Sequence, residues 1–448
     1  MKSTLITNAR IINENRNFTG HVLIRGHRIE KIWAEPAQPT ITHNTEIINA
    51  RGKWLLPGVI DDQVHFREPG LTHKGDLHTE SRAAVAGGVT SYMDMPNTIP
   101  PTTTQALLNE KIDLAASKSI ANFGFFIGAT NNNLDELKRA DARTTCGIKV
   151  FMGSSTGNLL VDDPQALDAI FRLRKMPIAV HAEDDSIILK NLEHYRSRYG
   201  DDIPMEMHPL IRSAEACYQA SSLAVSLARQ HKSRLHLIHL STAREITLLE
   251  KGARPSQKLI TSEVCVHHLW FDDQDYEAKG SLIKWNPAIK RAEDREALVQ
   301  ALLNDQLDII ATDHAPHTLA EKDRPYTSAP SGAPMIQHSL PLMLQFHHQG
   351  IIPVERIVEK MCHNPAEIFR IKNRGYIREG YYADLVIVDP SDPWTVNPRN
   401  IYYKCGWSPL QDTLLQSRVC QTFVNGHLAY DQGLFNESER GMVLEFER

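Results

Sequence analysis

Five side chains that can bind a metal ion stand at the ends of short apolar runs in the middle of the sequence. The runs are VIDDQVHF, GIKVFM, IAVHAED, LHLIHLST and LDIIATDHAP, and the side chains are those of His65, Lys149, His181, His239 and Asp313. In a parallel β/α barrel every strand points the same way, so residues at the carboxyl ends of the strands converge on one mouth of the barrel. Imidazole and carboxylate ligands without a thiolate suit zinc, with manganese, cobalt or iron as alternatives. The pattern predicts the divalent-metal centre of a hydrolase.

Lys149 fits such a centre only in a modified form, because a lysine ammonium cannot bind a cation. Carbon dioxide converts the amine to a carbamate, which carries a negative charge and has two oxygens able to bridge two metal ions. The alternative is an unmodified lysine that buries its aliphatic chain and extends its ammonium group to solvent. We expect the carbamate, because GIKVFM would otherwise bury an unpaired amine in an apolar strand.

Asp313 and Arg67 have chemical roles open to them beyond the binding of metal. A carboxylate beside a metal centre can take the proton released by attacking water and deliver it to a leaving nitrogen. Arg67 stands two residues after His65, at the rim of the mouth, and a planar guanidinium pairs with both oxygens of a carboxylate. Asn97 ends the second strand in DMPNT, where it is either a binding residue or a turn residue after Pro96. Arg67 therefore predicts a substrate that bears a carboxylate.

Several histidines near these positions have more than one explanation. His236 precedes His239 by three residues, so along a strand the two side chains face opposite sides, and His239 is the better ligand. His267 and His268, in SEVCVHHLW, either surround the metal ligands or are purely structural. His317, in TDHAPH, could reach a bound substrate. Of these, we retain His239 as a ligand and His317 as a substrate contact.

The composition limits the classes of protein that the chain can belong to. Its 448 residues allow one large domain and a smaller one, and 42% hydrophobic with 23% charged residues is ordinary for a globular protein. The formal charge of −5, without a basic stripe, argues against a nucleic-acid partner. No apolar run approaches the roughly 18 residues that span a membrane, and the first residues lack the apolar core of a signal peptide. Six scattered cysteines without a CxxC pair predict a reduced, cytoplasmic protein.

The order of the predicted elements indicates an α/β fold, a (β/α)8 TIM-like barrel with a small β-sandwich domain. Residues 1–56 and 376–448 contain short alternating strands, which we expect to form the sandwich, and residues 57–375 form the barrel. Helix-like segments separate several of the apolar runs, which are continuously hydrophobic, as strands buried on both faces should be. Residues 315–335 have no period and are rich in Pro, Ser and Gly, which predicts a functional or mobile loop. The eight runs are 59–63, 90–94, 123–128, 147–151, 177–181, 235–239, 259–264 and 308–312.

Motifs over residues 50 to 430 resemble, in order, those of the dihydroorotases, which are cyclic amidohydrolases of the amidohydrolase superfamily. The matching segments are LLPGVIDDQVHFREPG, AGGVTSYMDMPNT, GIKVFMGSS, VHAED, LIHLST, EVCVHHL, NPAIK, ATDHAPH and NPAEIFRI followed by ADLVIVDP. The resemblance implies a β/α barrel with a β-sandwich, one or two zinc ions per subunit, and reversible hydrolysis of dihydroorotate to N-carbamoyl-aspartate in pyrimidine synthesis. It also implies a small-molecule substrate and a homodimer. The family's metal motifs fall on His65, Lys149, His181, His239 and Asp313, and its substrate contacts on Arg67, Asn97, Asn286, His317 and the backbone near Gly332.

Gln63 is the one departure from the motifs of this family. The family usually has His-x-His at the end of the first strand, where this chain has Gln63-Val64-His65. An amide oxygen is neutral and binds zinc more weakly than imidazole does. We expect the metal site beside His65 to be the weaker one, although a bridging carbamate would partly compensate.

Two alternatives to a dihydroorotase follow from the same motifs. The first is an allantoinase, dihydropyrimidinase or hydantoinase, but the corresponding stretch of allantoinases resembles HFNEPG, whereas this chain has HFREPG with Arg67. Dihydropyrimidines and hydantoins generally lack the carboxylate that an arginine would bind. The second is a catalytically silent scaffold of aspartate transcarbamoylase, which would have lost its ligands. Here Gln63 is one loss, while five ligands and Arg67 remain.

Overall fold

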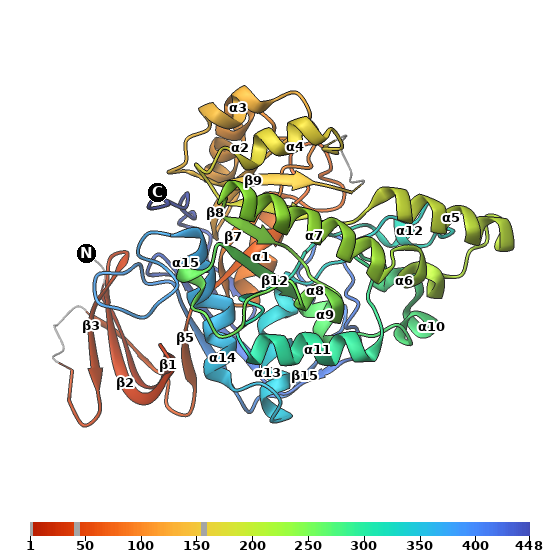
Figure 1. Ribbon diagram of the computed structural model, residues 1–448. Helices are drawn as coiled ribbons and strands as arrows, with labels where there is room; N and C mark the ends of the chain where they lie inside the picture. Colours follow the sequence, from red (N-terminus) through yellow and green to blue (C-terminus); the bar gives the residue numbers. More distant parts are fainter. Residues whose placement is uncertain (1–2, 40–44, 154–158) are drawn as a thin grey trace.

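The computed structural model describes residues 3–39, 45–153 and 159–448, and its centre is an eight-stranded parallel sheet (Figure 1). The sheet closes into a barrel because His65 N donates to His314 O at 2.7 Å, which brings the first strand beside the chain after the last one. This confirms the predicted fold class. The strands, in their order around the barrel, are β6 (Val59–Val64), β7 (Val89–Asp94), β8 (Asn122–Gly128), β9 (Thr145–Phe151), β10 (Ile178–His181), β11 (Leu235–Leu237), β12 (Ile260–Cys265) and β13 (Ile309–Ala311).

The barrel strands are buried on both faces, and helices cover the outside. All residues of β6, β7, β8, β9 and β10 are buried, which is why their sequences are mostly apolar without strict alternation, and the polar residues that β6 and β7 contain are buried too. Helix α7 (Ala214–His231) shows how an outer helix is specified. Ser213 caps its first turn through Ala216 N, and the small side chains that face the barrel recur every three or four residues. Further outer helices are α1 (Leu77–Ala86), α2 (Gln105–Lys118), α11 (Ala292–Leu303) and α13 (Ser339–His348).

A second, nine-stranded sheet combines strands from both ends of the described chain. Strand β5 runs parallel to β1 and antiparallel to β14, so that Trp54 lies opposite Val388. The predicted limits of the two domains, 1–56 with 376–448 and 57–375, stay a prediction. The strands are β1 (Ser3–Asn13), β2 (Arg16–Arg25), β3 (Arg28–Ala34), β4 (Thr45–Asn49), β5 (Trp54–Pro57), β14 (Leu385–Asp389), β17 (Arg418–Val424), β18 (His427–Asp431) and β19 (Leu434–Phe435).

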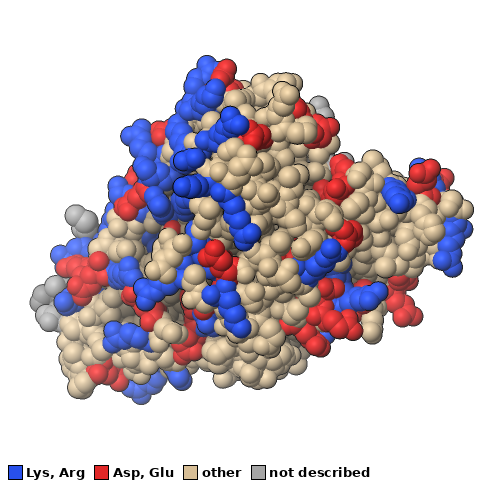
Figure 2. Space-filling view, in the orientation of Figure 1, with Lys and Arg blue, Asp and Glu red and all other residues tan. Residues whose placement is uncertain are grey.

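Positive side chains are not spread evenly over the surface. Figure 2 shows lysine and arginine side chains gathered down the side of the molecule where α3 (Leu134–Arg139) lies, with acidic side chains more frequent on the opposite side. The formal charge of −5 did not predict this asymmetry. The absence of a nucleic-acid partner stays a prediction. None of the helices within the described ranges is long and apolar enough to cross a membrane.

The segment after β19 returns to the barrel and closes its amino end. Leu444 N donates to Phe123 O at 2.8 Å, and Phe123 N donates to Met442 O at 3.0 Å. Leu444 is fully buried and Phe446 nearly so, in one apolar cluster with Ile60 and Phe126 from inside the barrel. The floor of the barrel is therefore built from a segment distant in sequence.

Replacing Leu444 by Ala should lower the free energy of unfolding by about 2–4 kcal/mol, because it removes buried methyl groups and leaves a cavity in the floor. Chemical denaturation monitored by circular dichroism measures this change. Leu434→Ala is the matched control, since Leu434 is 75% exposed, and it should change stability by less than about 0.5 kcal/mol. Equal effects of the two substitutions would contradict the description of the floor.

Candidate metal centre and substrate pocket

A cavity of about 380 Å³ opens at the carboxyl ends of the barrel strands. All eleven side chains or backbone positions predicted for the metal centre and the substrate line it, together with four further residues. The structure thus brings together every predicted position, while the role of each stays a prediction. The lining residues are Gln63, His65, Arg67, Asn97, Lys149, Phe151, His181, His239, Asn286, Asp313, Ala315, His317, Pro330, Ser331 and Gly332.

Three of the lining residues have a left-handed backbone. The φ angles are 69° at Arg67, 43° at His239 and 44° at Asp313. Residues other than glycine adopt this conformation at a cost of order 1–3 kcal/mol. The left-handed backbone at His239 and Asp313 also explains why β11 ends at Leu237 and β13 at Ala311, before the predicted ends of these runs at residues 239 and 312. At these residues the backbone leaves the hydrogen-bonding pattern of the sheet, and the side chains line the cavity.

His181 and His239 form the first half of the centre. His181 Nδ1 lies 2.9 Å from His239 Nε2, and the two rings meet edge to face. Burial lowers the pKa of both imidazoles, so both are neutral and each keeps one lone pair. His181 Nε2 lies 3.1 Å from Glu183 Oε2, within ion-pair distance, but it makes no hydrogen bond to the described residues. Two converging ring nitrogens on neutral imidazoles are suited to a shared divalent cation.

Glu183 is a functional residue that the sequence reasoning missed. Burial opposes its ionisation, but Arg212 and His181 outweigh that effect and lower the pKa of Glu183 to about 2. The carboxylate is fully buried and lies within ion-pair distance of His181. The only signal in the sequence was its place two residues after His181 in VHAED.

His65 and Asp313 form the second half of the centre. His65 Nδ1 lies 2.7 Å from Asn97 Oδ1, and His65 Nε2 lies 3.1 Å from Asp313 Oδ1. If Nδ1 donates to Asn97, the Nε2 lone pair faces a carboxylate oxygen, and two acceptors at this distance need a proton or a cation between them. This half of the donor set therefore also fits a metal ion. Asn97 is more than a turn residue, because its oxygen orients His65.

Gln63 does not point its carbonyl oxygen at the metal centre. Its Nε2 donates to Asp313 Oδ1 at 3.1 Å, while its Oε1 accepts from Cys265 Sγ at 3.8 Å. An amide nitrogen has no lone pair to give to a metal ion. In this orientation Gln63 acts as a hydrogen-bond donor to a ligand rather than as a ligand, which agrees with the expectation that the site beside His65 is the weaker one.

Lys149 is an orphaned amine on the wall of this cavity. The residue is 1% exposed, so its amine does not reach solvent, and among the described residues Nζ has no hydrogen-bond partner. Its closest aromatic neighbour is Phe151, with Nζ 4.7 Å from the ring centroid. Burial lowers the pKa of Lys149 to about 7, so a large share of the amine is uncharged near neutrality. The uncharged amine is the form that reacts with carbon dioxide, and the carbamate would supply the anionic ligand that the His181–His239 pair lacks.

On the substrate side, Arg67 and His317 lie together. Arg67 Nε donates to Pro316 O at 3.0 Å, and its Nη2 lies 3.0 Å from His317 Nε2. Lys74 Nζ lies 3.0 Å from His317 Nδ1, and because an ammonium only donates, Nδ1 must accept. The ring proton is then on Nε2, which donates to Ser331 O at 3.0 Å. This leaves Nη2 of Arg67 without an acceptor from His317 and free for a carboxylate.

Gly332 and Asn286 complete the pocket in different ways. Gly332 N donates to Lys284 O at 2.8 Å, so this amide is already used, whereas Gly332 O accepts from Lys322 and keeps a second lone pair. The substrate contact through the backbone near Gly332 stays a prediction. A Cβ there would lie 2.6 Å from Ala315 O, so the glycine provides space instead. Asn286 Oδ1 is buried without a hydrogen-bond partner in the described chain, as a substrate contact could be.

Two further groups have the spacing of metal ligands. Asp62, His236 and Glu263 form one, and His236 Nε2 lies 3.1 Å from Asp62 Oδ2 and 3.3 Å from Glu263 Oε2. Burial disfavours the imidazolium of His236, but Asp62 and Glu263 outweigh it and raise its pKa to about 9. Burial and the neighbouring Asp62 also raise the pKa of Glu263 well above its usual value, so protonation of this group competes with a metal ion. His236 faces these carboxylates and is not among the residues that line the cavity, as its spacing from His239 predicted.

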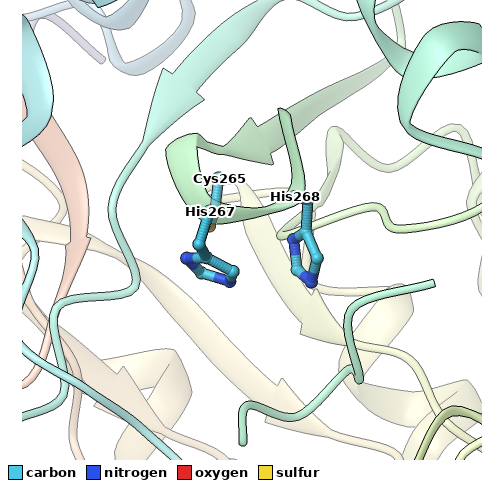
Figure 3. A group of neighbouring side chains, drawn as sticks. All are labelled: Cys265, His267 and His268. Carbon is cyan, nitrogen blue, oxygen red and sulfur yellow. The ribbon is translucent and has the colours of Figure 1, made fainter. Parts of the chain in front are cut away.

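The second group is Cys265, His267 and His268, at the end of β12 and the start of α9 (Val266–Trp270) (Figure 3). Burial raises the pKa of the Cys265 thiol well above its usual value, which disfavours the thiolate that binds metals. His267 stacks on Trp285 with ring centroids 4.0 Å apart, and His268 Nε2 lies 3.1 Å from Pro287 O. These contacts favour the structural explanation for both histidines.

Comparison with known proteins agrees with the geometry. The model of the amidohydrolase family matches residues 54–429. A dihydroorotase of Methanosarcina acetivorans is 34% identical, with 91% of this chain and 87% of the relative covered, and one of Pyrococcus furiosus is 32% identical, with 98% and 95% covered. Among solved structures, an L-hydantoinase (dihydropyrimidinase) from Arthrobacter aurescens has a TM-score of 0.92 and 26% identity, with 99% of this chain and 100% of that chain covered.

These matches define the class of enzyme first. The barrel and the family are those of metal-dependent hydrolases that act on cyclic amides. The chain belongs to the amidohydrolase family and, within it, to the dihydroorotases. The family predicted from the motifs is thereby confirmed, and so is a small-molecule substrate.

Proposed function

We propose that the enzyme interconverts (S)-dihydroorotate and N-carbamoyl-L-aspartate in the de novo synthesis of pyrimidines (UMP). The observation that carries the proposal is Arg67, a buried guanidinium with a free Nη2 in the same cavity as His181, His239 and Lys149. Burial lowers its pKa to about 10, so it is still charged at neutral pH and attracts a carboxylate. Relatives that bear the name dihydroorotase support the same substrate.

We further propose that the metal is zinc, with one or two ions per subunit. His181, His239 and a Lys149 carbamate would hold one ion, and His65, Asp313 and the carbamate would hold a second. When bound, the metal lowers the pKa of water towards neutrality and polarises the ring carbonyl. The neutral imidazoles and the partnerless amine support this donor set.

The residues of the chain then have separate tasks in the reaction. Arg67 holds the substrate carboxylate beside His317, whose ring nitrogens are engaged by Lys74 and Ser331, so that the cyclic amide lies above the metal centre. The Asn97 side-chain oxygen is used by His65, which leaves its amide hydrogens for the substrate. Asp313 takes the proton of the attacking water and delivers it to the ring nitrogen as the C–N bond breaks. In the reverse direction Asp313 takes a proton from the carbamoyl nitrogen and the ring closes.

A dihydropyrimidinase or hydantoinase is the second candidate, because the solved structure of an L-hydantoinase is so similar in fold. Turnover of dihydroorotate, dihydrouracil, hydantoin and allantoin by the purified enzyme tests the choice. We expect dihydroorotate to be preferred by a large margin. Preference for a neutral ring would overturn the proposal. Elemental analysis of the same sample separates an enzyme from a silent scaffold, which would contain little metal and turn over none of the four.

The partners and the location of the enzyme stay predictions. A homodimer, with association to aspartate transcarbamoylase as an alternative, is expected from the family alone. Sedimentation of the purified chain, with and without the transcarbamoylase of the same organism, tests both. A reducing, cytoplasmic location is supported by the six cysteines, all of which are free thiols.

Gln63→His should tighten the weaker metal site by about tenfold or more without a comparable gain in turnover. The substitution replaces an amide that donates to Asp313 by an imidazole, which improves ground-state metal binding rather than the transition state. Titration of zinc into the apo-enzyme, followed by calorimetry, measures both sites. Gln63→Met is the control, since it removes the amide without supplying a ligand. Two equally tight sites in the wild type, unchanged by Gln63→His, would show that Gln63 is no handicap.

A further inference from the structure

Two buried lysines lie directly behind one wall of the substrate pocket. Lys322 is 1% exposed and Lys284 is 7% exposed. Lys322 ends the short helix α12 (Leu319–Lys322), within the stretch 315–335 that the sequence left without periodic structure, and Lys284 follows a 3-10 turn at Gly280–Ile283. Both side chains point at the segment 326–332, of which Pro330, Ser331 and Gly332 line the pocket.

Each lysine Nζ donates hydrogen bonds to several backbone carbonyl oxygens, which surround it as they would surround a bound cation. Lys322 Nζ donates to Gly332 O at 2.8 Å, to Pro330 O at 2.9 Å and to Lys284 O at 3.4 Å. Lys284 Nζ donates to Tyr326 O and Ala329 O, both at 2.6 Å. Three acceptors around one nitrogen need three donors, which only the ammonium form of Lys322 has. Four of the five carbonyls belong to the pocket segment.

No carboxylate among the described residues lies within ion-pair distance of either ammonium group. The nearby acid, Glu321, is bound to Lys74 at 3.1 Å. Burial lowers the pKa of Lys322, and the positive charges of Lys284, Arg67 and Lys74 lower it further, so these four cations repel one another. A buried charge is costly unless it is well hydrogen-bonded. The carbonyls of the segment are therefore what keeps these two cations in place.

The braced segment also contacts the residues proposed to bind substrate. Ser331 O accepts from His317 Nε2 at 3.0 Å, and His317 lies against Arg67. Gly332 N donates to Lys284 O at 2.8 Å, which ties the segment back to the same lysine. A shift of the segment would move Ser331 O, release His317 and change the surroundings of the Arg67 guanidinium.

We propose that Lys284 and Lys322 are positioning residues that brace segment 326–332 as the carboxylate-facing wall of the pocket and leave an uncompensated positive charge behind it. The inference rests on the proposed function for the nature of the ligand, but not for the bracing itself. The surplus charge favours an anionic group in front of the wall, and the fixed carbonyls keep His317 and Arg67 aligned to receive it. Neither lysine is expected to touch the substrate.

Lys322→Met tests the proposal, because it removes the charge and three donors while it keeps most of the apolar stem. We expect amide hydrogen exchange in 326–332 to become at least about tenfold faster, since carbonyls that lose a charged donor leave the segment unanchored. The KM for dihydroorotate should rise by about tenfold or more, with a smaller change in kcat. Lys279→Met is the matched control: Lys279 Nζ donates to a single carbonyl, Pro409 O, at 2.8 Å outside the pocket, and its loss should leave both quantities unchanged.

If Lys322→Met fails to fold, hydrogen exchange in Lys284→Met and in the wild type still tests the proposal. Lys284→Met should accelerate exchange in the same segment, and in the wild type the Gly332 amide should be protected by its bond to Lys284 O. A folded Lys322→Met enzyme with unchanged exchange and KM would overturn the proposal, as would an unprotected Gly332 amide in the wild type. If dihydroorotate is not a substrate at all, the proposed function fails, while the exchange measurements still decide the bracing.

Discussion

Lys149→Ala should lose both its metal and its activity. The substitution removes the amine that would form the carbamate, and with it the anionic ligand that would join the His181–His239 pair to the His65–Asp313 pair. Turnover of dihydroorotate should fall by at least about a thousandfold, as is common when a metal-dependent hydrolase cannot hold its ion. Elemental analysis of the purified variant should find little zinc. Short carboxylic acids such as acetate or propionate should partly restore metal and activity, because they place a carboxylate where the carbamate would be.

Lys111→Met is the matched control for this prediction. Lys111 is also a buried lysine, 2% exposed, but its Nζ is paired with Asp94 at 2.6 Å and with Met95 O at 3.1 Å. Its loss should reduce thermal stability and leave the metal content of the folded protein unchanged. Native mass spectrometry or a crystal structure would decide the modification itself. Unmodified Lys149 in a fully active, metal-loaded enzyme would refute the carbamate.

Arg67→Met should reduce kcat/KM for dihydroorotate by roughly 30- to 1,000-fold. The loss of a bidentate, charge-assisted contact typically costs about 2–4 kcal/mol. The geometry supports a direct role, because Arg67 Nη2 has no acceptor once the ring proton of His317 is assigned. Steady-state kinetics with dihydroorotate measures the effect.

The neutral substrate dihydrouracil is the control for Arg67→Met. It has no carboxylate, so it should be a poor substrate of the wild type and should suffer little from the substitution. An equal loss on both substrates would mean that Arg67 maintains the loop around Pro316 rather than the specificity. Thermal unfolding of the variant separates that outcome from a general loss of stability.

The barrel and the positions around its mouth could be predicted because the residue types of each strand reflect the burial of that strand. Both faces of β6 to β10 are buried, so the runs are mostly apolar without strict alternation, and a metal-binding residue that ends such a run is conspicuous. Parallel strands then bring those ends together without further information. His65, His181 and Asp313 could therefore be assigned to one cavity although they lie far apart in the sequence.

The supporting contacts could not be predicted, because they join segments whose relative placement the sequence does not state. Lys74 meets His317 across two loops, and Lys284 meets the carbonyls of Tyr326 and Ala329. Lys74 stands in the polar stretch LTHKGD, where a lysine is ordinarily a solvated side chain, so nothing in its local sequence marks its contact with His317. The left-handed backbone at His239 could not be predicted for a related reason. That conformation is unfavourable for a histidine, and only the surrounding structure maintains it.

The returning segment at the barrel floor has a consequence for how the protein is made on the ribosome. Strand β8 begins with Asn122 and Phe123, whose hydrogen-bond partners Met442 and Leu444 are translated much later. At a synthesis rate of roughly 5–20 residues per second, the apolar interior around Phe126 remains uncovered by Leu444 and Phe446 for tens of seconds. A nascent chain in this state exposes surface that chaperones bind and that aggregates at high expression. A low expression level should thus matter more for the yield of this enzyme than for a barrel whose floor is closed by neighbouring residues.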